Sequence, residues 1–142
     1  MKNKLLISSA PNLGLLILRI GIGIMFLLHG FPKLMGGLQT WEFLGSQMSV
    51  VGINFAPVFW GFMAAISESL GGLLLILGLF TRPAAFLMLF TMLIATLMHL
   101  TNGDGLKGAS HAIELGIVFI SVIIIGAGKY SLDHLFFYRK ES

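Results

Sequence analysis

Long apolar stretches alternate with short polar segments along this chain of 142 residues. The apolar stretches lie at about residues 12–31, 57–80, 83–100 and 110–128. Each is close to the roughly 20 helical residues that are needed to cross about 30 Å of hydrocarbon. Prolines stand at or near the start of three of them, where the first turn of a helix accepts proline. The pattern predicts an all-α fold, an integral membrane four-helix bundle.

The segment between the first two stretches is longer than the other connections and mixed in character. Trp41 and Leu44 stand beside Glu42 and Gln47 there. Because a helix with one apolar and one polar face lies at a membrane surface, we expect a short interfacial helix in this first outer loop. No internal repeat divides the sequence, so residues 1–142 are expected to form a single transmembrane domain.

Composition favours a membrane protein over a soluble helical bundle. Hydrophobic residues make up 56% and charged residues 11% of the chain, whereas a soluble domain contains roughly 25% charged residues. Four soluble helices would each need a polar face, and the chain has too few charged residues to supply them. The first stretch is also expected to be retained, because it contains Arg19 and is longer than the roughly 7–15 apolar residues of a signal peptide.

Basic residues are distributed unevenly between the two sides of the predicted bundle. With four crossings, both termini and the second loop lie on one side, which collects Lys2, Lys4, Arg82, Lys129, Arg139 and Lys140. The other side has Lys33 and Lys107. The positive-inside rule therefore predicts a multi-pass protein of the bacterial cytoplasmic (inner) membrane with its N- and C-termini in the cytoplasm. The lipid bilayer is the expected partner, and the net charge of +3 requires no nucleic acid to explain it.

The chain contains no cysteine. Disulfides, thiol relays, iron–sulfur ligation and thiolate metal sites are therefore excluded. The sequence also shows no nucleotide-binding fingerprint and no flavin motif. A redox role would require a bound cofactor or protein partner subunits.

Ionisable residues gather at the outer level of the predicted bundle. His29 ends the first transmembrane helix and His99 ends the third. His111 and Glu114 lie in the first turns of the fourth helix, and Lys33 follows His29 by one turn. Because ionisable groups at membrane depth usually face the bundle interior or water, we expect these side chains to converge on a catalytic or binding site.

Several chemistries fit this outer level. Imidazole and carboxylate donors suit zinc or non-haem iron, and the candidate metal ligands are His29, His99, His111 and Glu114. Two of the histidines could instead hold a haem. Neither is favoured, because no H-x-x-x-H pair supplies two metal ligands from one helix and because the bundle is small for a haem. A quinone is the remaining candidate: the three histidines and Lys33 would bind it, and Glu114 with the histidines would transfer protons.

A second charged group is expected deeper in the membrane. Glu68 lies near the middle of the second transmembrane helix, and Arg19 lies within the first. A lone charge at these depths costs a few kcal/mol, so we expect Arg19 and Glu68 to form a structural ion pair. Gly23 and Gly30 share a face with Arg19, and small residues surround Glu68, so these two helices are expected to pack closely.

Three segments together resemble the DoxX family of small four-helix membrane proteins. They read LRIGIGIMFLLHGFPKL (18–34), ESLGGLLLILGLFTRPAA (68–85) and AIELGIVFISVIIIGAGKYSLD (112–133). The family pattern falls here on Arg19, His29, Gly30, Lys33, Glu68, Gly71, Gly72, Gly78, Thr81, Arg82, His99, Glu114, Ser131, Leu132 and Asp133. The resemblance implies a link to thiosulfate:quinone oxidoreductase and to membrane-associated oxidoreductase complexes. The family's usual Gly-Pro-Gly before the final motif is replaced by Gly-Ala-Gly (126–128).

We therefore expect a membrane redox component, a subunit of a quinone-linked oxidoreductase that meets the quinone pool through a polar site near the outer leaflet. Two other functions stay open at this point. One is a small-molecule or proton binding and permeation module in which Glu68 is the working residue. The other is a structural membrane subunit without catalysis, whose polar residues only hold helices together.

Overall fold

The computed structural model describes residues 2–138, and all regular secondary structure within them is helical. The long helices are α1 (Lys2–Met35), α3 (Pro57–Leu77), α4 (Thr81–Thr101) and α5 (Gly105–Ile125). Each contains a segment long and apolar enough to cross a membrane. The shorter elements are α2 (Gly37–Ser46), the 3-10 helix η1 (Gln47–Val51) and the π-helical turn η2 (His134–Tyr138). The predicted all-α fold with four transmembrane helices is confirmed, and α2 is the short helix expected in the first outer loop.

The helix ends differ from the predicted bounds for local reasons. Pro11 lies inside α1 instead of preceding it. α3 ends before residue 80 because Gly78 adopts a left-handed conformation with φ of 65°, which is a common way to end a helix. α5 begins at Gly105, earlier than expected, and ends before residue 128 because Gly126 has φ of 85°.

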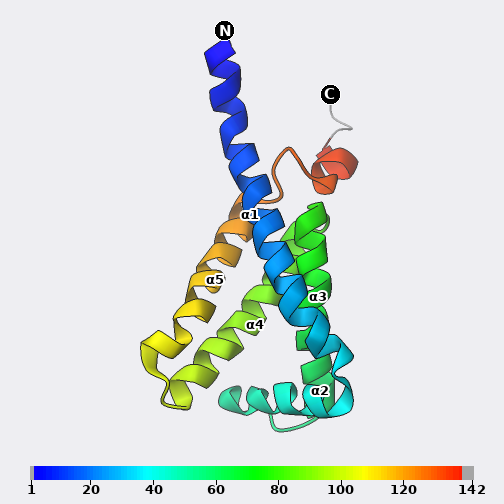
Figure 1. Ribbon diagram of the computed structural model, residues 1–142, viewed down its shortest axis with the longest axis vertical. Coiled ribbons are helices and arrows are strands. Elements are labelled where there is room, and N and C mark those ends of the chain that lie inside the picture. Colours follow the sequence, from blue (N-terminus) through cyan, green and yellow to red (C-terminus); the bar gives the residue numbers. More distant parts are fainter. Residues whose placement is uncertain (1, 139–142) are drawn as a thin grey trace.

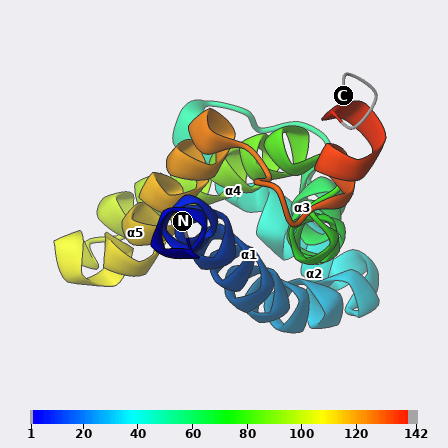
Figure 2. The same cartoon turned by 90° about the horizontal axis from the view of Figure 1, so that it is seen from above.

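The helices form two antiparallel pairs. α1 packs along α3 and α4 packs along α5, while α2 lies across α3. The first turns of α1 and the turn η2 lie at one end of the molecule, and α2 lies at the other (Figure 1). Seen from above, the pair α1 and α3 lies beside the pair α4 and α5 (Figure 2). The cytoplasmic location of the termini stays a prediction.

Glycines bring α1 and α3 together backbone to backbone. A Cβ atom added at Gly23 would lie 2.6 Å from the carbonyl oxygen of Gly72, and one at Gly30 would lie 2.5 Å from the amide nitrogen of Ser69. Such distances are too short for any side chain, so only glycine permits this approach. Small residues serve the same purpose at helix interfaces in membranes generally. The expected packing through Gly23 and Gly30 is confirmed.

Another pair of glycines seats α2 on α3. A Cβ atom at Gly45 would overlap the carbonyl oxygen of Pro57, and one at Gly61 would overlap that of Trp41. The indole Nε1 of Trp41 donates a hydrogen bond of 3.1 Å to the carbonyl oxygen of Lys33. The same ring packs edge-on against Phe62, with 4.8 Å between the ring centroids. α2 is therefore fixed to both α3 and the end of α1.

Arg19 does not pair with Glu68, so that prediction is wrong. Arg19 is only 1% exposed, and its guanidinium donates to the carbonyl oxygens of Leu75 at 3.3 Å and Tyr130 at 2.5 Å. Leu75 lies seven positions after Glu68, which is about 10 Å along a helix. The glycine contacts set this register, and they place Lys33 rather than Arg19 beside Glu68.

Asp133 closes the same end of the molecule. Its carboxylate oxygens accept hydrogen bonds from the backbone amides of Phe80 at 2.7 Å and Thr81 at 2.9 Å. Its own amide donates to the carbonyl oxygen of Gly78 at 2.8 Å. A carboxylate at this position satisfies the free amides at the start of a helix. The segment after α5 therefore caps the start of α4.

Gly78→Ala should destabilise the protein. The added Cβ would overlap the guanidinium of Arg19, and the left-handed φ alone costs about 1–3 kcal/mol for a residue with a side chain. Gly21→Ala is the matched control, since nothing lies within 4 Å of its Cβ position and it is inside α1. Thermal unfolding of the detergent-solubilised variants measures both. Equal midpoints for the two variants would contradict the packing described here.

Asp133→Ala should also lower stability, because it leaves two amides at the start of α4 without their acceptor. Loss of a helix cap costs about 0.5–2 kcal/mol. Glu42→Ala, at an exposed position of α2, should leave the unfolding midpoint close to that of the wild type. A midpoint for Asp133→Ala as high as that of the control would show that the cap contributes nothing.

Candidate functional site

A cavity of about 540 Å³ lies between α3 and α4, at the end of the molecule that carries α2. Most of its lining is apolar, and the polar lining residues are Lys33, Gln47, Ser67, Glu68, Thr91 and His99. Cavities of roughly 300–1,000 Å³ that combine an apolar lining with a few polar groups are typical of small-molecule sites. This cavity is therefore the candidate functional site.

The cavity exists because α3 and α4 diverge. The two helices are joined by a tight turn and separate toward the α2 end (Figure 1). Leu44 of α2, with Gln47 and Met48 of η1, lines the end where the helices are farthest apart. Nearer the turn the helices are in close contact, since a Cβ at Gly71 would lie 2.8 Å from the sulfur of Met88.

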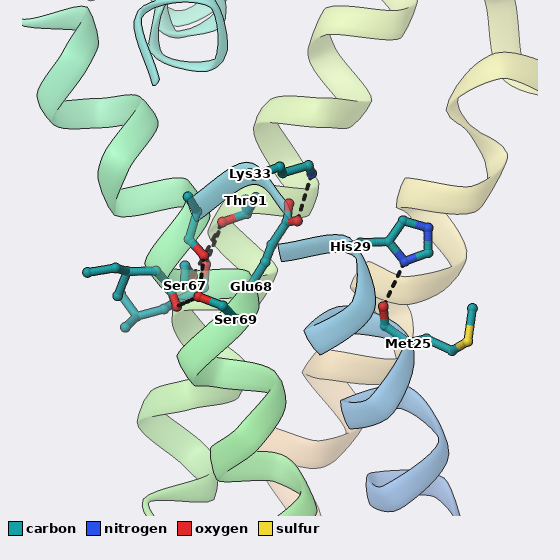
Figure 3. Close-up of polar contacts among 10 residues, drawn as sticks. Met25, His29, Lys33, Ser67, Glu68, Ser69 and Thr91 are labelled. Carbon is teal, nitrogen blue, oxygen red and sulfur yellow. Dashed lines mark hydrogen bonds and ion pairs between the residues drawn. The ribbon is translucent and has the colours of Figure 1, made fainter. Parts of the chain in front are cut away.

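Lys33 and Glu68 form an ion pair in the cavity wall. The Nζ of Lys33 lies 2.7 Å from Oε2 of Glu68 (Figure 3). The carboxylate side chain is 6% exposed and the lysine side chain 35% exposed. Gly30, one turn before Lys33, brings α1 against the backbone of Glu68. Without Lys33, the buried carboxylate of Glu68 would carry a charge that nothing compensates. The ion pair therefore stabilises the charge of Glu68 beside the cavity.

Two hydroxyl groups add polar contacts across the cavity. The Oγ1 of Thr91 on α4 lies 3.4 Å from the Oγ of Ser67 on α3. Figure 3 shows this contact on the same side of α3 as the carboxylate of Glu68. A hydroxyl can both donate and accept a hydrogen bond. These groups can therefore bind either a carbonyl or a hydroxyl of a ligand.

His99 lines the cavity near the C-terminal end of α4 and is oriented by a carboxylate. Its Nδ1 lies 2.7 Å from Oδ2 of Asp104. Asp104 precedes α5, but its side chain makes no hydrogen bond to that helix. Because a carboxylate only accepts hydrogen bonds, Nδ1 carries a proton and Nε2 remains for another partner. The imidazole is thus oriented as in sites of acid–base catalysis, in which a third group positions the base.

The structure separates the residues of the predicted outer cluster. Lys33 and His99 line the cavity, whereas His29 is exposed and its Nδ1 lies 2.7 Å from the carbonyl oxygen of Met25 (Figure 3). His111 and Glu114 are exposed on α5. Within residues 2–138 no three His, Cys, Asp or Glu side chains lie close enough to share a metal ion. The expected four-ligand convergence is not formed, because equal depth does not place side chains on facing sides of their helices.

Several cavity residues were missed or misassigned from the sequence. Glu68 was expected to be the structural partner of Arg19, or the working residue of a permeation module, and not the partner of Lys33. Ser67 and Thr91 of the cavity, and Asp104 beside His99, were not considered as site residues. Ser67 and Thr91 are hydroxyl residues within otherwise apolar helices. That pattern is a usable signal, since polar groups at membrane depth face the protein interior. Asp104 had no such signal, because it lies in a polar loop.

Comparison with known proteins assigns the family. A model of the DoxX family matches residues 14–100, more than half of the chain. A Haemophilus influenzae protein named only as uncharacterized is 35% identical, over 87% of this chain and 90% of that protein. Inner membrane protein YphA of Escherichia coli is 31% identical, over 84% of this chain and 87% of YphA. A Bacillus subtilis protein named "Putative oxidoreductase CatD" is 29% identical, over 92% of both chains.

No solved structure matches the chain significantly. The family match covers the ion pair of Lys33 and Glu68 and extends through His99. Together with the four helices of membrane-spanning length, it shows that this chain is an integral membrane protein of the DoxX family.

Proposed function

We propose that this protein is a redox component of the bacterial inner membrane that binds a quinone in the cavity between α3 and α4. The observation that carries the proposal is the lining of one apolar cavity by the ion pair of Lys33 with Glu68 and by His99, whose Nδ1 is held by Asp104 outside the cavity. The name "Putative oxidoreductase CatD" supports the class, and the name of YphA, as an inner membrane protein, supports the location.

The cavity residues match the chemistry of a quinone ring. The ring is flat and apolar, and its carbonyl oxygens accept hydrogen bonds. The ammonium of Lys33 and a protonated imidazole of His99 are donors for those oxygens. The apolar side chains that line the rest of the cavity cover the faces of the ring.

Reduction of a quinone to a quinol consumes two electrons and two protons. His99, as an imidazolium, gives one proton from Nε2 to a carbonyl oxygen while Asp104 stabilises the ring through Nδ1. The ammonium of Lys33 gives the second proton to the other carbonyl oxygen, and the carboxylate of Glu68 holds that ammonium in place. The neutral imidazole and amine then take up protons from the aqueous side. The electrons come from a flavin or metal centre of a partner subunit, since this chain has neither cysteine nor a nucleotide-binding fingerprint. The reverse sequence of steps oxidises a quinol.

Packing below the cavity favours a binding site over a pathway across the membrane. Toward the end that carries the termini, Gly71 contacts Met88 and Gly23 contacts Gly72. Phe119 and Met88 are both 0% exposed in this layer. A ligand or proton that enters the cavity therefore meets a closely packed layer beneath Glu68.

His99→Ala should weaken quinone binding by about tenfold or more, because it removes a hydrogen bond from a charged imidazole to the ligand. Binding of a quinone analogue to the purified protein, followed by calorimetry or by tryptophan fluorescence, measures the change. His111→Ala is the matched control, because His111 is exposed on α5 away from the cavity, and it should bind as the wild type does. Equal affinity of His99→Ala and His111→Ala would remove His99 from the site.

The permeation alternative predicts a different result for Glu68. If the cavity is a closed binding site, proteoliposomes with the wild-type protein should leak protons no faster than those with Glu68→Gln. The proton flux is measured with a pH-sensitive dye inside the vesicles. A flux that is present in the wild type, lost in Glu68→Gln and insensitive to quinol would overturn the redox proposal in favour of proton permeation.

A further inference from the structure

The two ends of the cavity differ in exposure. At the inner end, Glu68 is 4% exposed and Ser67 is 6% exposed. At the rim, Met63 of α3 is 38% exposed and Leu87 and Phe90 of α4 are 49% and 45% exposed. All five residues line the same cavity. Glu68 and Ser67 are therefore enclosed and the apolar rim is open to the outside of the bundle, while the side chains of Lys33 and His99 are each 35% exposed.

The rim lies at a depth where the surroundings are hydrocarbon. Phe90 and Leu87 precede the end of α4 at Thr101 by 11 and 14 residues, which is about 16–21 Å along the helix axis. A hydrocarbon core is about 30 Å thick, so these side chains lie near its middle. Whatever leaves the cavity between Met63 and Leu87 enters the interior of the bilayer rather than water or the headgroup region.

We infer that the ligand is a membrane-borne amphiphile with a polar ring and a long single hydrocarbon chain, and that its chain leaves sideways between α3 and α4. This inference rests on the proposed function, because it takes the enclosed polar end as the site of the quinone ring. The ring lies beside Lys33, Glu68 and His99, and the chain passes Met63, Leu87 and Phe90 into the lipid. The opening bounded by these three rim residues is called the lateral portal below.

The lateral portal explains how a ligand reaches buried charges without crossing water. A ring on a hydrocarbon chain dissolves in the bilayer, diffuses in its plane and enters with the chain still in lipid. The apolar rim costs nothing to expose there, since lipid chains solvate it. A quinone without a chain would not reach the rim, so the rim would stay in contact with lipid and would add nothing to the binding of that quinone.

Narrowing the lateral portal tests this inference. Leu87→Trp and Met63→Trp are expected to reduce the affinity for a decyl-tailed benzoquinone by about tenfold or more, because the indole would occupy the path by which the chain leaves the cavity. The affinity for the same quinone ring without a tail should stay that of the wild type. Leu93→Trp is the control, because Leu93 is 52% exposed on α4 but does not line the cavity. All affinities are measured in nanodiscs and compared with the wild type for each ligand, so that partition into lipid cancels.

The outcomes separate the two proposals. Binding of neither quinone to the wild type would overturn the proposed function and this inference with it. Binding of both quinones, with tailed and tailless affinities unchanged in Leu87→Trp and Met63→Trp, would overturn the lateral portal alone. An equal loss of both ligands in the tryptophan variants would also overturn it, because the blocked region would then hold the ring. Equal competition by decanol against the tailed quinone would show that the cavity binds any alkyl chain and would likewise overturn it.

Discussion

The close approach of α1 and α3 determines where three charged groups of this bundle lie: Lys33, Glu68 and Arg19. Lipid chains are as apolar as the side chains of the helices, so association depends on contact between backbones rather than on escape from water. Gly23 and Gly30 permit that contact at two successive levels against Gly72 and Ser69. The two helices are thereby held in one antiparallel register. That register places Lys33 beside Glu68 and carries Arg19 to the carbonyl oxygens at the other end.

The register divides the molecule into two ends with different tasks. At one end Arg19 and Asp133 tie together the end of α3, the start of α4 and the segment after α5 through hydrogen bonds to the backbone. At the other end α3 and α4 are apart, and polar side chains face an open cavity. Because the hydrogen bonds of Arg19 and Asp133 hold the turn between α3 and α4, the two helices can diverge at the other end. Two helices that separate from a firmly held turn leave space without losing their relative placement.

The sequence predicted the fold far better than the site. Hydropathy and length were enough for four spans and the short helix α2, because a membrane demands both. The depth of each residue in the membrane could also be predicted from its position along its helix, and it put His99 and Lys33 at the end of the bundle that holds the cavity. The direction in which each side chain points was not readable, since a helix turns 100° at every residue and the partner of each face is set by contacts distant in sequence. His29 illustrates this: it directly precedes Gly30, which touches α3, yet it is exposed and bonds only to its own helix. The choice between Arg19 and Lys33 as the partner of Glu68 required the register of α1 against α3. The glycine contacts set that register in the structure, but the positions of the glycines in the sequence do not show which residues of the two helices lie opposite each other.

The cap supplied by Asp133 has a consequence for the order of biogenesis. The turn between α3 and α4 is short and local, and both helices can enter the membrane as a hairpin while the ribosome is still translating α5. The amides of Phe80 and Thr81 nevertheless obtain their acceptor from a residue that follows α5 in the chain. The hairpin is therefore completed only after the last span has been inserted and the following segment has folded back. The end of the molecule that contains the cap is therefore assembled late, after all four spans are in the membrane.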